Sequence, residues 1–279
     1  MTEEAKRQRV PAESPPQPKS DAHVTSPIRL EGVCYVINGT AVLDGVDLTV
    51  PRGEIFAVMG RSGIGKTTLL RLLMGLIKPT RGSVFINDED ITLLGERALD
   101  RVRAGMGLVF QGAALFDSMT VGENVAVGLV EHRLVRPDEV AGRVRRLLEM
   151  VEVAGAEHLM PAALSGGMRK RVGIARALAM EPAIVLYDEP TAGLDPIYAA
   201  AIDALIRELR DRMGVTSVIV SHDVASLRRV CGRAALLHAG RILAVGSMAQ
   251  LEASEDPAVK QFLSGSPVGP MTGSAQRER

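Results

Sequence analysis

The sequence predicts an α/β fold with a mostly parallel sheet, an N-terminal antiparallel β subdomain and an inserted α-helical subdomain. Three observations support this prediction. Two strand-like runs joined by an Asn-Gly turn stand near the start of the chain, which is typical of an antiparallel hairpin. A block of helical periodicity occupies the middle. Apolar strand-like runs then alternate with helical stretches, as in a mostly parallel sheet.

Composition limits the classes of protein that fit. The chain has 279 residues, 46% of them apolar, so it can bury a large core as one large domain or about two smaller ones. Acidic and basic residues number 33 each and only 3% of residues are aromatic, which disfavours a nucleic-acid partner. Without an apolar run of roughly 18 to 20 residues or a signal-peptide layout, a cytoplasmic location is expected. The isolated Cys34 and Cys231 are expected to be reduced and buried.

The two ends of the chain differ from the region between them. Residues 1–27 place proline among charged and polar residues, which bury too little apolar area to offset the entropy of ordering, so a disordered arm is expected. Residues 251–279 are expected to form a C-terminal extension with a flexible tail from about Ser264, where Gly, Ser and Pro are frequent. The main domain therefore covers residues 28–250, with the helical subdomain at about residues 112–165.

The first half of the main domain contains the predicted hairpin and one helix. Residues 34–37 and 46–50 are strand-like, and the turn lies at Asn38-Gly39. Residues 55–59 are continuously apolar, which is typical of a strand buried on both faces of a sheet. Residues 67–75 are predicted to form a helix whose apolar residues occur all around it, so it is expected to be buried.

The later elements follow from the same patterns. Helices are expected over residues 121–130 and 137–153, where apolar residues recur at helical spacing. Further strands are expected at residues 184–187, 217–220 and 234–237, and further helices at residues 168–180, 199–211 and 224–230. In the helix over residues 168–180, we expect Arg169, Lys170 and Arg171 to face outward and Val172, Ala175 and Leu178 to face inward.

One glycine-rich loop links the predicted buried strand to the predicted buried helix. It fits the phosphate-binding pattern G-x-x-x-x-G-K-S/T and predicts a P-loop NTPase core. The candidate nucleotide-binding residues here are Gly60, Arg61, Ser62, Gly63, Ile64, Gly65, Lys66, Thr67 and Thr68. By reach, Lys66 can contact the β and γ phosphates, the Thr67 hydroxyl can bind Mg²⁺, and Thr68 is placed for the α phosphate.

Two more groups are placed for phosphate chemistry. Asp188 and Glu189 follow a buried strand, at the carboxyl edge of the sheet where ligands bind in open α/β folds. Ser165, Gly166 and Gly167 stand at the start of the helix predicted over residues 168–180. The serine is a candidate helix cap, and the two glycines leave N–H groups free to bind an anion.

Together, the loop, the Leu164-Ser165-Gly166-Gly167-Met168 segment and the acidic strand end resemble the ATP-binding subunits of ABC transporters over about residues 28–250. The resemblance implies ATP and Mg²⁺ as cofactors. It implies that Asp188 holds Mg²⁺ through water and that Glu189 polarises or deprotonates the attacking water. It also implies a homodimer in which Ser165, Gly166 and Gly167 contact the γ phosphate held by the opposite subunit.

The same resemblance implies roles for four single residues. Gln111 matches the Q-loop glutamine, which contacts Mg²⁺ and the water, and Asp195 matches the D-loop aspartate. His222 matches the switch histidine near the γ phosphate. Tyr35 stands where the family places an aromatic ring that stacks on adenine, and a tyrosine of the strand core is the alternative.

Three further segments resemble the ATPases of the Mla and MCE phospholipid-transport systems: Met168, residues 112–119 and residues 256–270. This resemblance implies transport of phospholipid between bacterial membranes, and a peripheral position on the inner membrane. Its implied partners are a polytopic permease and an MCE-domain lipid-binding protein, and it allows for a small STAS-domain protein. The alternatives are an ATPase of an amino-acid or other small-solute importer, and a soluble non-transport ABC ATPase.

The resemblance implies that a permease docks at the loop after Gln111. Phe116, Met119 and Val121 are expected either to line that docking groove or to belong to the core.

Overall fold

The N-terminal strands pair as an antiparallel hairpin. In this computed structural model, which describes residues 26–273, β1 (Ile28–Ile37) pairs with β2 (Thr40–Val50). Two strands that the sequence analysis did not identify, β4 (Arg81–Ile86) and β5 (Glu89–Asp90), complete a sheet of order β2-β1-β4-β5. The disordered arm expected over residues 1–27 lies, apart from its last two residues, outside the described range.

The second sheet is mostly parallel, as predicted. Its order is β10-β9-β3-β8-β7-β6, and only β10 pairs antiparallel to its neighbour. Its strands are β3 (Ile55–Met59), β6 (Met106–Val109), β7 (Ile184–Asp188), β8 (Thr216–Ser221), β9 (Arg233–His238) and β10 (Arg241–Ser247).

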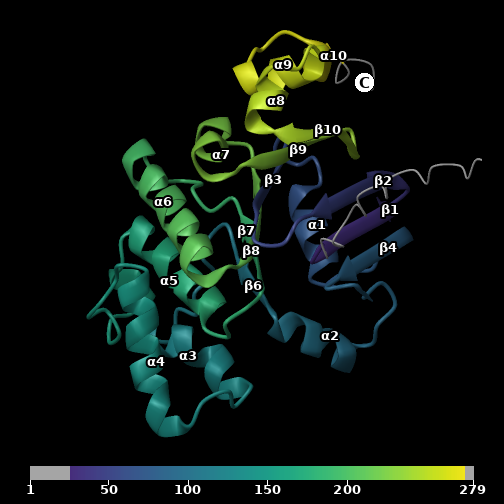
Figure 1. Ribbon diagram of the computed structural model, residues 1–279. Coiled ribbons are helices and arrows are strands. Elements are labelled where there is room, and N and C mark those ends of the chain that lie inside the picture. Colours follow the sequence, from purple (N-terminus) through teal and green to yellow (C-terminus); the bar gives the residue numbers. More distant parts are fainter. Residues whose placement is uncertain (1–25, 274–279) are drawn as a thin grey trace, which may run out of the picture.

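Helices cover both faces of this sheet (Figure 1). The helices of residues 26–273 are, in chain order, α1 (Lys66–Leu73), α2 (Glu96–Ala104), α3 (Val121–Glu131), α4 (Pro137–Met150), α5 (Gly166–Leu178), α6 (Pro196–Met213), α7 (Val224–Val230), α8 (Met248–Glu252), α9 (Pro257–Ser264) and α10 (Pro270–Gly273), with a 3₁₀ turn at Pro161–Ala163 before α5. The helices α3 and α4 lie within the expected helical subdomain, beyond α5 in Figure 1.

The alternation of side chains along β3 divides the core into two parts. Phe56 and Val58 pack with α1 and the antiparallel sheet, whereas Ala57 and Met59 pack with α5, α6 and α7. Because β3 is buried on both faces, the loop after it emerges at the carboxyl edge, with the ends of β7 and β8 beside it.

In the segment that leads into α3, Val121 and Phe116 differ in burial, which bears on whether these residues belong to the core or to an exposed surface. Val121 is fully buried and belongs to the core, whereas the Phe116 side chain is 49% exposed. The fully buried Asn124 amide holds this segment: it donates to the carbonyls of Phe116, Met119 and Thr120 and accepts from the Phe116 N–H.

The predicted outward orientation of three basic residues on α5 is wrong for Lys170. Lys170 is only 6% exposed, because the turn of α5 that carries it packs against the loop after β6 and the end of β7. Arg171 is also largely covered, since its guanidinium binds the Val151 carbonyl and Glu152. Arg169 is exposed as expected, and Val172, Ala175 and Leu178 face the core as predicted.

The C-terminal extension is structured further than the sequence suggested. The flexible tail was expected from about Ser264, but the helix α10 follows it and packs on α9. The buried Gln261 side chain accepts from the Met271 N–H and donates to Ser266 and Thr272, and Met271 itself is buried. These contacts order the extension as far as the described residues go.

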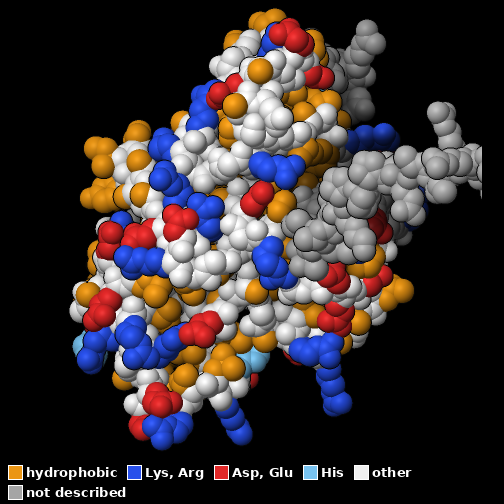
Figure 2. All heavy atoms as spheres, viewed as in Figure 1, with side chains coloured by type: hydrophobic (Ala, Val, Ile, Leu, Met, Phe, Trp, Pro, Cys, Tyr) orange, Lys and Arg blue, Asp and Glu red, His pale blue; other side chains and the backbone are white. Residues whose placement is uncertain are grey.

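The surface mixes both signs of charge. On the face viewed in Figure 2, basic and acidic side chains lie interspersed over the helical part of the molecule, which follows from the balanced composition. Within residues 26–273, no helix combines the length and the hydropathy that crossing a bilayer requires. Cys34 and Cys231 are both buried free thiols, as expected.

Candidate active site

The loop between β3 and α1 has the backbone of a phosphate cradle. A Cβ atom at Gly60 would lie 2.6 Å from the Leu237 carbonyl oxygen, so only glycine allows the loop to start so close to β9. Gly65 has φ 111 and precedes the first residue of α1 without a side-chain cap. The first N–H groups of α1 are therefore free to bind an anion at the positive end of the helix.

Lys66 is folded back over this loop. Its Nζ donates to the carbonyls of Gly60 at 2.9 Å and Arg61 at 3.1 Å, and it lies 3.3 Å from Glu189 Oε1. The residue is 6% exposed, so this ion pair is largely shielded from water. Lys66 is thus held where a phosphate group in the loop would be its natural partner.

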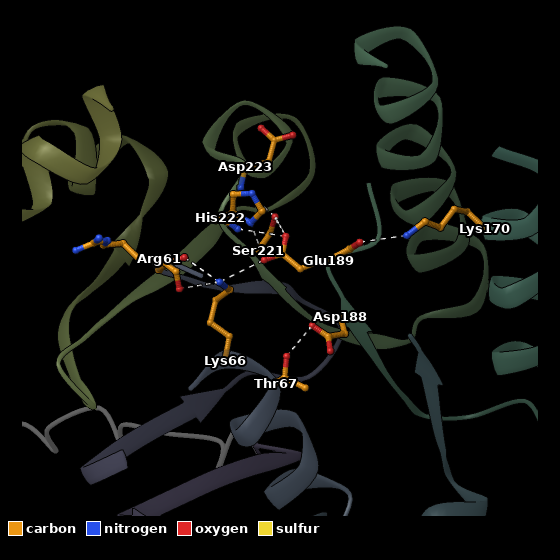
Figure 3. Close-up of polar contacts among 10 residues, drawn as sticks. Arg61, Lys66, Thr67, Lys170, Asp188, Glu189, Ser221, His222 and Asp223 are labelled. Carbon is orange, nitrogen blue, oxygen red and sulfur yellow. Dashed lines mark hydrogen bonds and ion pairs between the residues drawn. The ribbon is translucent and has the colours of Figure 1, made fainter. Parts of the chain in front are cut away.

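The Glu189 carboxylate is held by groups from the end of β8 as well (Figure 3). The Ser221 hydroxyl donates to Glu189 Oε2 at 2.9 Å, and His222 Nδ1 lies 2.8 Å from Oε1. Burial raises the pKa of Glu189, but the hydrogen bond with His222, the charge of Lys66 and the Ser221 hydroxyl together hold this pKa below its usual value. Glu189 is therefore an ionised carboxylate, the form that can accept a proton.

Oxygen atoms suited to Mg²⁺ lie beside this carboxylate. The Thr67 hydroxyl donates to Asp188 Oδ1 at 3.2 Å, and both residues line a small cavity together with Gln111. Burial raises the pKa of Asp188, although the bond from Thr67 acts against this. Hydroxyl, carboxylate and amide oxygens are the donors that Mg²⁺ prefers, so the residues present fit this ion.

A cavity of about 430 Å³ brings half of the predicted site residues together. Its lining residues are Val42, Ser62, Gly63, Gly65, Lys66, Thr67, Thr68, Gln111, Glu189 and His222. Tyr35 is not among them: it is partly buried and packs with the core on the antiparallel sheet. Val42, which the sequence analysis did not single out, lies against Gly65 and forms the wall there instead.

The Arg61 side chain points out of the loop. Its guanidinium donates to the Met271 carbonyl at 2.8 Å, toward the C-terminal extension (Figure 3). Within the loop, only the Arg61 backbone takes part, as an acceptor for Lys66.

The four predicted residues at the N-terminal ends of α5 and α6 also lie outside this cavity. Ser165 caps α5, since its hydroxyl accepts from the Met168 N–H at 3.2 Å, and Gly166 and Gly167 form the first turn. Ser165 and Gly166 are exposed. Asp195 caps α6, where its carboxylate accepts from two N–H groups. Within one chain, the ends of α5 and α6 therefore face solvent and not the loop.

Sequence reasoning missed two residues that contact Glu189. Ser221 was not singled out as a site residue, and Lys170 was expected to face outward. Lys170 falls on the same side of α5 as the buried Gly167, Ile174 and Leu178, so helical spacing could have placed it inside. Burial lowers the pKa of Lys170, while the charges of Asp188 and Glu189 act in the opposite direction.

Comparison with known proteins agrees with this geometry. A family described as "ABC transporter" matches residues 43–192. The intermembrane phospholipid transport system ATP-binding protein MlaF of Escherichia coli (strain K12) is 42% identical over 89% of this chain and 92% of its own length. The probable ribonucleotide transport ATP-binding protein mkl of Mycobacterium tuberculosis (strain ATCC 25618 / H37Rv) is 36% identical over 90% of this chain and 70% of its own length.

A solved structure is also similar to this chain in three dimensions. The ATP-binding cassette MJ0796, in a dimeric post-hydrolysis state bound to ADP and phosphate, superposes with a TM-score of 0.72. It is 33% identical, and the match covers 79% of this chain and 98% of the cassette. The fold is therefore that of an ATP-binding cassette, and the chain belongs to the ABC transporter family as an ATP-binding, ATP-hydrolysing subunit.

Proposed function

We propose that this chain powers the transport of phospholipid between bacterial membranes, as the ATPase subunit of an Mla-type complex. The observation that carries this proposal is the 42% identity to MlaF, which extends over 89% of the chain. The identity covers the helical subdomain as well as the nucleotide loop, so the likeness is not limited to the motifs that all ATPases of this family need.

Two copies of the chain are proposed to close on two molecules of ATP. The position of Ser165 supports this: it stands exposed at the N-terminus of α5, outside the cavity that contains Lys66. A second copy could bring that end, with its free N–H groups, against the γ phosphate. Each nucleotide would then be bound by Lys66 of one copy and by Ser165, Gly166 and Gly167 of the other, with Asp195 at the same seam.

Within one site, each polar group has a separate proposed task. The loop N–H groups and Lys66 bind the phosphates, Thr68 faces the α phosphate, and Glu189 accepts the proton of the attacking water. Gln111 and His222 orient that water and the γ phosphate. Thr67, Asp188 and Gln111 would hold Mg²⁺, which supplies positive charge against the phosphates when bound.

The adenine base has a proposed place beside the loop. Tyr35 remains the proposed stacking partner, although its ring packs with the core and does not line the cavity in this conformation. Val42 is the residue of the antiparallel sheet that does line it.

The proposed permease would bind at the segment after Gln111. The exposed Phe116 ring supports this, because Asn124 fixes the backbone that presents it. Docking there would place the chain peripherally on the cytoplasmic side of the inner membrane. An MCE-domain lipid-binding protein and a small STAS-domain protein are the further proposed partners, and nucleic acid is not.

The relative named for ribonucleotide transport provides a second candidate, since it matches 90% of the chain at 36% identity. The amino-acid or other small-solute importer is a further alternative. These three candidate functions can be distinguished if the tagged chain is purified from its native membranes and the subunits and lipids that accompany it are identified by mass spectrometry. A polytopic permease, an MCE-domain protein and phospholipid are expected. Recovery of a small-solute binding protein in their place would contradict the proposed cargo.

A further inference from the structure

Lys170 connects two parts of the active site that the sequence treats as separate. It stands in the second turn of α5, and its Nζ donates to the backbone carbonyl of Gln111. It also donates, at 3.3 Å, to the backbone carbonyl of Glu189 (Figure 3). One side chain thus binds the residue that is proposed to orient the water and the residue that is proposed to take its proton. The same helix begins beside Ser165.

Packing alone does not explain why a lysine occupies this buried position. An ammonium group loses hydration in such a place, and an apolar side chain of similar length usually fits a buried site at no loss of stability. The carboxylate of Glu189 is already bound by Lys66 and His222, so Lys170 binds the carbonyl of that residue and not its charged group. Its contacts therefore fix backbone positions.

The backbone at both ends of these contacts is unusual. Glu189 has φ 46, a left-handed conformation that is costly for a residue with a side chain. Beyond Gln111, Ala113 and Ala114 have φ 61 and 46, and their carbonyls accept from Arg176, which is also on α5. The basic residues of α5 thus hold the two strained segments that carry Gln111 and Glu189.

We propose that Lys170 is a positioning residue for ATP hydrolysis, which holds the Gln111 and Glu189 backbones so that the two side chains face the same water. This inference rests on the proposed role of Glu189 as the base. Since Lys170 and Ser165 share one helix, it also means that a shift of α5 on closure of the dimer moves the backbone of Glu189.

The test compares steady-state ATP hydrolysis by four full-length proteins: the wild type, Lys170→Met, Lys170→Arg and Arg171→Met. Lys170→Met keeps the length of the side chain and removes its donors. Its kcat is expected to fall about tenfold or more, with KM for ATP changed by less than about twofold, because Lys170 does not line the nucleotide cavity. Lys170→Arg restores donors and is expected to recover kcat to within about threefold of the wild type.

Arg171→Met is the matched control. It removes the neighbouring basic residue of the same helix, whose contacts are with Val151 and Glu152 in the helical subdomain, so kcat per folded molecule should stay within about twofold. A thermal unfolding curve of each variant gives the folded fraction. If Lys170→Met does not fold, Lys170→Leu, which also has no donor, takes its place in the same comparison.

Two results would overturn the inference: a wild-type kcat in Lys170→Met, or an equal loss in Arg171→Met. A fifth protein, Glu189→Gln, is assayed in the same way, so that a failure of the role proposed for Lys170 can be distinguished from a failure of the role proposed for Glu189. If Glu189→Gln is inactive while Lys170→Met is fully active, only the inference about Lys170 fails. If Glu189→Gln turns over ATP at the wild-type rate, the proposed base fails first.

Discussion

The ammonium of Lys66 lies 3.3 Å from the carboxylate of Glu189, so the phosphate loop and the end of β7 neutralise each other across the site. Both residues are buried, and each has further partners on its own side. A nucleotide phosphate is a stronger partner for Lys66 than one carboxylate, because it also accepts from the loop N–H groups. We therefore expect nucleotide binding to release Glu189 from Lys66 and leave it free to act on water.

Lys66→Ala is expected to weaken ATP binding by about tenfold to a hundredfold, because a charge-assisted hydrogen bond to phosphate is lost. Isothermal titration with a slowly hydrolysed ATP analogue measures this. Affinity equal to that of the wild type would place the phosphates elsewhere. Lys78→Ala, an exposed lysine beyond α1, serves as the control with unchanged affinity.

Glu189→Gln is expected to lower kcat by about a hundredfold or more, since the amide cannot accept a proton. It should still bind ATP, because Lys66 and the loop N–H groups are intact, and it should accumulate as a closed dimer on size-exclusion chromatography with ATP. Normal turnover in this variant would contradict the assigned role.

The rate at which a thiol reagent labels Cys231 reports how well the core beside α7 is closed to solvent. Burial raises its pKa to about 12, so at pH 8 only about one molecule in ten thousand carries the reactive thiolate. In a Cys34→Ser variant, we expect a thiol reagent to label Cys231 at pH 8 only after denaturant is added. Raising the pH toward 10 should increase the labelling of the folded protein. Rapid labelling of the native chain at pH 8 would show that α7 does not cover this thiol.

Substitution of Asn124 tests whether its side-chain hydrogen bonds hold the segment that contains Phe116. Asn124→Leu fills the same buried space but leaves the Phe116 N–H and the Met119 carbonyl without their side-chain partner, whereas the carbonyls of Phe116 and Thr120 still accept from backbone N–H groups. The expected cost is about 2 kcal/mol in the free energy of unfolding. Urea denaturation measures this, and the exposed Glu131→Ala on the same helix should change it by less than about 0.5 kcal/mol. Equal effects of the two substitutions would contradict the role given to Asn124.

The parts of the fold that the sequence predicted are those set by local pattern. The strand over residues 55–59 and the helix over residues 224–230 have the predicted bounds. The strand is an apolar run that ends at Gly60, and the helix lies between its cap Asp223 and the pair Cys231-Gly232. The strands β4 and β5 were missed because they are defined by pairing with a distant partner, as in Ile28 with Ile86, and β5 has only two residues.

The candidate site divides in the same way. Residues of the contiguous loop and of the strand ends line one cavity, because a parallel sheet brings its carboxyl ends to one edge. Lys170 was misplaced because residue type was given more weight than helical spacing, and its contacts depend on how α5 packs against two other segments. Tyr35 and Val42 lie on neighbouring strands, and which one lines the cavity depends on pairing and twist that the sequence does not state.

The most direct test of the shared site is the ATPase activity per subunit, measured over a range of protein concentrations together with sedimentation of the same samples in ATP. The account predicts that activity rises in parallel with the dimer fraction, and that Ser165→Arg, which blocks the anion site at the start of α5, abolishes both. Constant activity per subunit in samples that remain monomeric, with Ser165→Arg as active as the wild type, would contradict it.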